Sequence, residues 1–180
     1  MTHQISLSVG ASTDQSRNKV STSEDRVNST ATTTVESDSE VCTLEIGVKN
    51  DSDREDVCSL EWYFISEKTP VKGDKEPGVF DSGKEELTLQ KGSDEKKTIV
   101  SKPFVFTVRT IDRVGNDDNN DSGNSKRTRQ GDTYVGYIVL VKAGGKILDQ
   151  DSNSSSYLTD EWLARCAAFV KPAEGKKKKK

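Results

Sequence analysis

Residues 41–66, VCTLEIGVKNDSDREDVCSLEWYFIS, contain two apolar alternations separated by a polar stretch. An alternation with a period of two predicts a strand that buries one face. The intervening NDSDRED, residues 50–56, is typical of a turn, so the segment predicts a β-hairpin. The inward residues are Cys42, Leu44, Ile46 and Val48 in the first strand, and Cys58, Leu60, Trp62 and Phe64 in the second.

The two cysteines of this hairpin are expected to be free thiols. If the turn is centred near Asp53, Cys42 and Cys58 are offset by about six positions, or about 20 Å at ~3.3 Å per residue. A disulfide needs Cα atoms within about 7 Å. The third cysteine, Cys166, is expected on a helix. The sequence therefore predicts three free, buried thiols.

The remaining apolar segments predict further strands. Residues 134–141 are apolar on both faces, which is typical of a central strand, and AGGK at 143–146 predicts a glycine turn into a partner strand. Tyr134, Ile138 and Leu140 are expected on one face, and Val135, Tyr137, Val139 and Val141 on the other. Shorter strands are expected at residues 5–9, from about Val27, and at 78–80, 85–90 and 104–108, while the polar residues 11–26 and 112–132 are expected to form loops.

The segment TDEWLARCAAFV, residues 159–170, predicts one amphipathic helix that begins at Thr159. Its apolar stripe consists of Leu163, Cys166, Ala167 and Val170, widened by Trp162 and Phe169. The chain is expected to divide into three parts: a loosely ordered N-terminal segment with an edge strand (1–26), a β-sandwich domain that includes the helix (27–171), and a disordered basic tail (172–180).

The residues LEIGVKNDSD, 44–53, followed by SLEWYFIS, 59–66, resemble the second and third strands of immunoglobulin-like and fibronectin-III-like domains of bacterial envelope proteins. The two-cysteine bridge of antibody domains is missing from this chain. The expected fold is mainly β: an antiparallel immunoglobulin-like β-sandwich of about seven to nine strands with one C-terminal amphipathic helix. Such a resemblance implies an architecture without an activity.

Charge and composition limit the partners and the location. The net charge of −3 includes five C-terminal lysines, so the rest of the chain carries −8. An acidic body argues against nucleic-acid binding, which needs clustered cations with stacking aromatics. No apolar run approaches the roughly 18 residues of a membrane span. The start of the chain shows no signal peptide. The resemblance to envelope domains nevertheless favours an extracytoplasmic location, periplasmic or secreted.

The inventory of reactive side chains argues against an enzyme. The chain has one histidine, His3, close to its start, and its cysteines are expected in the core. A Ser-His or Cys-His pair would need that terminus to fold back onto a buried thiol. No catalytic residue and no cofactor is therefore expected. The first functional hypothesis is a non-catalytic interaction or structural module of an envelope-associated or secreted protein, with a protein or glycan partner.

The alternative hypothesis is a calcium- or carbohydrate-binding module that uses residues 149–160. Calcium takes oxygen ligands at alternating loop positions, and this segment offers such a set but has Ser154 where a turn glycine belongs. The candidate ligands are Asp149, Asp151, Asn153 and Asp160. The competing interpretation is a solvated loop followed by an acid in the first helical turn. For a sugar, Tyr63 and Tyr134 are the candidate aromatic platform.

Overall fold

The computed structural model describes residues 4–26, 29–115 and 124–170, and these form a mainly β protein. Within those residues there are eight strands and one α-helix. The strands are β1 (Ile5–Arg26), β2 (Ser29–Asn50), β3 (Asp56–Thr69), β4 (Glu76–Leu89), β5 (Asp94–Val100), β6 (Phe104–Gly115), β7 (Asn124–Ala143) and β8 (Lys146–Ser152). A short 3₁₀ turn (Ser155–Tyr157) leads into α1 (Asp160–Val170).

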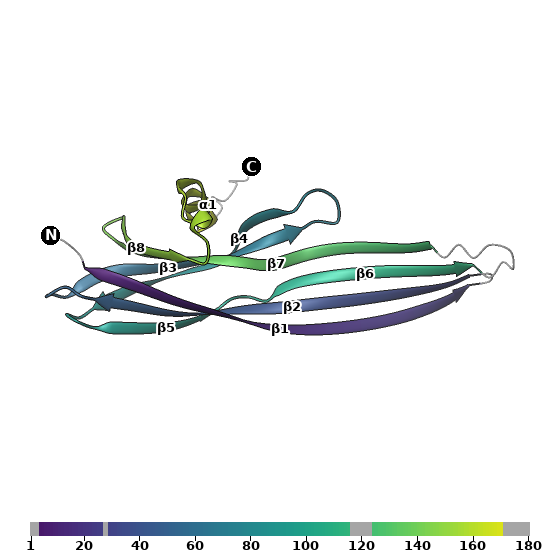
Figure 1. Ribbon diagram of the computed structural model, residues 1–180, viewed down its shortest axis with the longest axis horizontal. Coiled ribbons are helices and arrows are strands. Elements are labelled where there is room, and N and C mark those ends of the chain that lie inside the picture. The colour runs from purple at the N-terminus through teal and green to yellow at the C-terminus, as the bar shows by residue number, and fades with distance from the viewer. Residues whose placement is uncertain (1–3, 27–28, 116–123, 171–180) are drawn as a thin grey trace, which may run out of the picture.

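All eight strands belong to one antiparallel sheet that folds over on itself. Its order is β1-β2-β6-β7-β3-β4, with β5 beside β2 and β8 beside β7. In Figure 1 the strands β1, β2 and β5 form one layer, and β3, β7 and β8 lie across from them with α1 on the outside. The expected antiparallel mainly β fold with one C-terminal helix is confirmed.

Two hydrophobic clusters hold this end of the molecule together. The larger lies between the layers and joins the inward side chains of β2 to those of β3 and β7. The smaller lies on the other face of β3 and β7, where Cys166 and Leu163 of α1 cover Tyr63 and Ile138. β3 and β7 are therefore buried on both faces, which is the environment of central strands. The central position expected for residues 134–141 is confirmed.

The hairpin expected at residues 41–66 is wrong in its pairing. β2 pairs with β1, β5 and β6, whereas β3 pairs with β4 and β7, so the two strands face each other across the core. The connection crosses between layers and is held by Asn50, whose side-chain amide donates to the carbonyls of Arg54 and Leu89. Because β3 is buried on both faces, it takes a central place in its own layer instead of pairing with β2.

A bulge in β7 corrects the expected facing of Tyr134 and Val135. The register with β3 shifts between Ile65 and Ser66, so that Ile65 is opposite Gly136 and Ser66 is opposite Tyr134. The extra residue moves Tyr134 to the face of the larger cluster and Val135 to that of the smaller one. An added residue in one strand reverses the side-chain alternation beyond it, which a simple period of two does not anticipate.

The three thiols are free and buried, as expected. Cys42 and Cys58 lie in the larger cluster, and Cys166 lies under α1 in the smaller one. Burial raises the pKa of the Cys58 and Cys166 thiols to about 11. These cysteines are uncharged core residues at neutral pH.

Four strands continue from this core as a narrow extension, which we call the arm: residues 11–26 of β1, 29–40 of β2, 104–115 of β6 and 124–131 of β7. Phe104, at the base of the arm, still belongs to the larger cluster. The rest of the described chain is called the body. Figure 1 shows the arm extending well beyond the helix and β4. The loop expected at residues 11–26 is wrong, because β1 continues through it, and β6 and β7 extend into the loop expected at 112–132.

Smaller elements follow the expectations more closely. The glycine turn between β7 and β8 is present, and both Gly144 and Gly145 have positive φ values, 56° and 79°. The strands expected at 78–80 and 85–90 are one continuous strand, β4, with a register shift opposite Phe64 and Ile65. The tail at 172–180 and the strand start at Val27 lie outside the described residues.

The described helices are too short and too polar to cross a bilayer.

Candidate functional site

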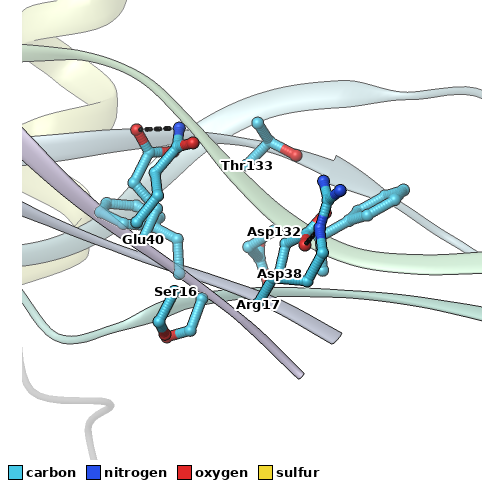
Figure 2. Close-up of a pocket in the computed structure, with 10 residues that line it drawn as sticks. Ser16, Arg17, Asp38, Glu40, Asp132 and Thr133 are labelled. Carbon is cyan, nitrogen blue, oxygen red and sulfur yellow. Dashed lines mark hydrogen bonds and ion pairs between the residues drawn. The ribbon is translucent and has the colours of Figure 1, made fainter. Parts of the chain in front are cut away.

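A groove lies where the arm leaves the body. Its volume is about 440 Å³, and four strands contribute to its walls. Figure 2 shows Ser16 and Arg17 of β1, Asp38 and Glu40 of β2, and Asp132 and Thr133 of β7 around the groove. Phe104 and Phe106 of β6 complete the lining. Phe104 is buried and stacks on Phe80 with ring centroids 4.3 Å apart, which anchors this wall to β4.

The charged groups of this groove are already engaged with one another. Arg17 makes two hydrogen bonds to Asp38, at 2.6 and 3.3 Å. The Gln15 amide donates to Glu40 at 3.3 Å, and the Ser66 hydroxyl donates to Asp132 at 2.9 Å. The charged side chains of the groove therefore have hydrogen-bond partners within the chain. The lining residues include no histidine and no cysteine.

The most extended binding feature of the arm is the outer edge of β1. The carbonyl of Gln4 accepts from the N–H of Asp51, so the even residues of β1 direct their backbone groups toward β2. The N–H of Leu7 points the other way and donates to the Asp149 carboxylate of β8 at 2.8 Å. Because the register with β2 is continuous, the odd residues direct their N–H and C=O groups outward along the whole strand.

Beyond Leu7 this edge has no partner strand within the described chain. The outward residues run from Val9 to Asp25. Unpaired backbone groups along a strand edge are a template for a further strand, and most proteins shield them with prolines, bulges, charges or short strands. The exposed Val20 lies near the middle of this edge, with 53% of its surface accessible. β1 therefore presents a long strand edge that is open to another chain.

The other edges of the sheet are shielded by those means. β4 contains Pro77 and the register shift opposite Phe64 and Ile65. β5 and β8 are only 7 residues long. The arm edge of β7 carries three cations in close succession, at Lys126, Arg127 and Arg129. β1 has no proline and no register shift, so it is the edge best suited to pairing.

The cations Arg17 and Lys19 of β1 are paired with acids of β2, which partly offsets their charge at the exposed edge. Arg17 is paired with Asp38, and Lys19 lies 3.0 Å from Glu36. The hydrogen bond and charge of Lys19 lower the pKa of Glu36, so the pair stays ionised at neutral pH. Toward the tip the pairs become hydroxyls: Ser21 with Thr34 and Ser23 with Thr32. Such cross-strand pairs support a sheet without an apolar core.

The four candidate calcium ligands do not come together. Asp149 accepts from the N–H groups of Leu7 and Gln150, and Asp151 accepts from the Tyr137 hydroxyl. The Asn153 amide bridges the backbone of β7, and Asp160 begins α1. No group of three or more His, Cys, Asp or Glu side chains in the described part of the chain is arranged to hold a metal ion. Asp149 and Asp151 lie in strand β8 and not in a loop.

The aromatic pair considered for sugar binding is also used internally. Tyr63 is 2% exposed, and its hydroxyl donates to Glu61 at 2.9 Å. The Tyr134 ring packs against Phe104 with centroids 5.4 Å apart. Neither ring is presented to solvent as a flat platform.

The sequence predicted strands from about Val27 and at 104–108, but sequence reasoning missed the β1 part of the arm and its edge, because those polar residues show no apolar period. One signal was present: Gln15, Arg17 and Lys19 at alternate positions of one segment complement Glu40, Asp38 and Glu36 at alternate positions of the next. Opposite charges with this spacing, reversed in order, are typical of an antiparallel pair.

Comparison with known proteins does not identify a family. No protein-family model matches the chain. No curated protein matches it either. A solved structure described as "X-ray structure of Northeast Structural Genomics Consortium target SoR45" is similar at 14% sequence identity and a TM-score of 0.23, over 77% of this chain and 88% of that chain.

Proposed function

We propose that this protein is a non-catalytic interaction module and that the arm is the part that meets its partner. The observation that carries the proposal is the outer edge of β1, where the odd residues from Val9 to Asp25 direct their backbone groups outward beside no other strand of the described chain. A partner that adds an extended segment there satisfies these groups and continues the sheet. Main-chain hydrogen bonds supply affinity in this mode, and alternate side chains supply specificity.

The body supplies a rigid base for such an arm. β2 is one strand from the buried clusters into the arm and pairs with β1 along its whole length, so the edge strand is held in its extended form before binding. A preformed edge spares the partner the entropy of ordering both strands. The groove beside Arg17 and Phe106 lies at the base of the edge and gives room for side chains of the incoming segment.

The absence of catalysis is part of the proposal, and two observations support it. The thiols lie in the hydrophobic clusters with raised pKa values, which disfavours the reactive thiolate. The groove is lined by carboxylates that are already engaged and by phenylalanine rings.

We also propose that the module is an immunoglobulin-like β-sandwich of an envelope-associated or secreted protein. The support for this assignment is the antiparallel sheet folded into two layers, in which the strands that carry LEIGVKNDSD and SLEWYFIS face each other across the core. Modules of this architecture commonly work through surface contacts and not through a reaction. We do not propose calcium or carbohydrate binding, because candidate side chains such as Asp149, Asp151 and Tyr63 have partners within the chain.

The test is site-specific photo-cross-linking in cells that produce the protein. A benzophenone amino acid replaces Val20 on the β1 edge or, as a matched control, the equally exposed Val57 of the body. We expect a defined cross-linked protein from position 20 alone, and its loss when Ser21→Pro is added, because proline blocks strand addition at an edge. Equal capture from both positions, or capture that survives Ser21→Pro, would contradict the proposal.

A further inference from the structure

We infer that the strand which β1 accepts is β1 of a second copy of this chain, in an antiparallel pair centred on Ser21. This inference rests on the proposed function, since it names the partner of the same edge. Its basis is the segment RNKVSTSED, residues 17–25. The cations Arg17 and Lys19 stand at one end of the segment and the acids Glu24 and Asp25 at the other.

Reversal of this segment against itself brings opposite charges together. In an antiparallel pair centred on Ser21, Arg17 lies directly opposite Asp25 of the second copy, and the same contact recurs across the two-fold axis. Lys19 lies opposite Ser23, which leaves Asp25 within diagonal reach of its ammonium. A parallel pair in the same register would instead place each charge against its own copy, which is destabilising.

The backbone pattern agrees with this register. Outward N–H and C=O groups belong to the odd residues of β1, as Leu7 shows through its bond to Asp149. In the pair centred on Ser21, odd residues face odd residues, so residues 17, 19, 21, 23 and 25 form hydrogen-bonded pairs with about ten bonds in all. Centring the pair on Arg17 or Lys19 keeps this parity but places like charges directly opposite. The charges therefore favour Ser21 over those two centres.

The side chains on both faces accept the pairing. On one face the two Ser21 side chains lie opposite each other. The Lys19–Ser23 pair follows on either side, and the Arg17–Asp25 ion pair lies beyond it. On the other, Val20 lies opposite Thr22 of the second copy, and such β-branched neighbours stabilise a sheet. Val20 is 53% exposed in the single chain and becomes partly covered. The two arms then form one continuous sheet, with the order β7-β6-β2-β1 on one side of the two-fold axis and the same order reversed on the other.

Sedimentation equilibrium of the full chain over about a hundredfold range of concentration tests the inference, because self-association depends on concentration. We expect a monomer–dimer equilibrium that Ser21→Pro weakens by at least about tenfold, since proline removes an outward N–H and is tolerated at an edge. Ser21→Ala is the matched control: it removes the same hydroxyl but keeps the N–H, and it should still dimerise. A monomeric wild-type chain, or a dimer unaffected by Ser21→Pro, overturns the inference.

A cysteine pair tests the register and does not depend on the proline variant. Residues directly opposite in a hydrogen-bonded pair have Cα atoms about 5.5 Å apart, within disulfide range. Ser21→Cys, on the two-fold axis, should therefore form an intermolecular disulfide under mild oxidation. Ser23→Cys should not, because its opposite residue is Lys19. Cross-linking of Ser23→Cys alone, or of both variants equally, contradicts the register.

The outcomes separate this inference from the proposed function. A monomer whose position 20 still captures a different protein in cells, in a manner abolished by Ser21→Pro, refutes the second copy and supports the interaction module. A dimer sensitive to Ser21→Pro supports both. A dimer held by the ion pairs should also weaken as salt is raised, because exposed charges are screened.

Discussion

The body and the arm are parts of one sheet, yet different interactions stabilise them. In the body Leu44, Phe64 and Val139 are fully covered between layers. In the arm the ten residues 31–40 of β2 are only half-buried, and their neighbours are hydroxyls and ion pairs. The same backbone ladder runs through both. Strand length in this protein is therefore set by backbone pairing and not by the extent of the core.

The difference also assigns a role to each region. Burial of apolar surface is the main stabilising contribution to folding, so the body should fix the stability of the molecule. The arm gains its order by continuation from β2 and β7, and regions with few buried contacts open most easily. The arm presents unsatisfied backbone groups on a strand that is already extended, which suits it to pairing with a partner strand.

Removal of a core ring should affect the body far more than removal of an apolar side chain in the arm. Phe64 is fully buried in the larger cluster. Phe64→Ala should lower the free energy of unfolding by about 3–5 kcal/mol, because it deletes buried surface and leaves a cavity. Val20→Ala, at an exposed position of the arm, should change it by about 0.5 kcal/mol or less. Urea unfolding followed by circular dichroism measures both, and equal losses would contradict the division.

Alkaline pH should destabilise the body through its thiols. Burial raises the pKa of Cys58 and Cys166 from 9.0 to about 11. Between these values the unfolded chain has released protons that the folded chain still holds, so stability is complete below about pH 9 and falls as the pH rises toward 11. The loss should be on the order of 2 kcal/mol per thiol. Urea unfolding at about pH 8 and about pH 10.5 measures it.

Cys58→Ala should reduce this dependence on pH without abolishing it, since Cys166 and the buried Tyr137, whose pKa is raised to about 12, remain. Thiol titration gives an independent check: the native protein should react slowly, and the denatured protein should show three thiols without reductant. Rapid reaction of the native protein would contradict the buried assignment.

The junction between body and arm should be sensitive at Gly131. This residue pairs with Phe106 of β6 and with Thr69 of β3, where β7 changes partners. Its φ is +131°, and an added Cβ would lie 2.2 Å from the carbonyl oxygen of Val105. Gly131→Ala should therefore cost about 1–3 kcal/mol. It should also speed amide exchange in the arm more than in the body.

Gly78→Ala is the matched control, because an added Cβ there meets nothing within 4 Å. It should be neutral within about 0.5 kcal/mol. If both glycine variants melt alike, the close approach at the junction is not what holds the arm in place.

The sequence predicted the body better than the arm, for a physical reason. Apolar alternation indicates a strand face that is buried on folding. It therefore predicted the inward residues of β2 and β3 and the central position of β7, and helical spacing predicted the buried Cys166. Alternation does not say which strand lies beside which. The pairing of β2 with β3 was wrong because Tyr63 and Ile65 are buried under a helix that begins about a hundred residues later.

Beyond residues 104–108, where Phe104 and Val108 are buried, the arm shows no such alternation. Its threonines and serines favour strands but also occur in loops, and a charged residue such as Arg17 predicts a loop unless its partner is known. The candidate site depends on the register between Arg17 and Asp38, which is a long-range fact about the fold. The one sequence signal for this register is that the cations in residues 15–19 and the acids in residues 36–40 occur at alternate positions in reversed order.

Two ion pairs of equal length give the finest comparison. Lys142 and Glu61 in the body, and Arg17 and Asp38 in the arm, are both separated by 2.6 Å. Their side-chain exposures differ, at 26% and 12% against 75% and 46%. Although burial of Glu61 opposes its charged form, the hydrogen bond from Lys142 leaves its pKa lowered. Lys142→Met should therefore cost about 1–3 kcal/mol, because the largely buried Glu61 carboxylate loses its nearer cation and retains Lys84 at 3.7 Å.

Arg17→Met should cost less than about 1 kcal/mol, since water solvates Asp38 once the cation is removed. Salt should weaken the contribution of Arg17 and leave that of Lys142 nearly unchanged, because exposed charges are screened and buried ones are not. Urea unfolding of both variants at low and high salt checks this. A cost for Arg17→Met that equals that of Lys142→Met would mean that the arm shares the energetics of the body, and the order of the arm could then no longer be attributed to its ladder alone.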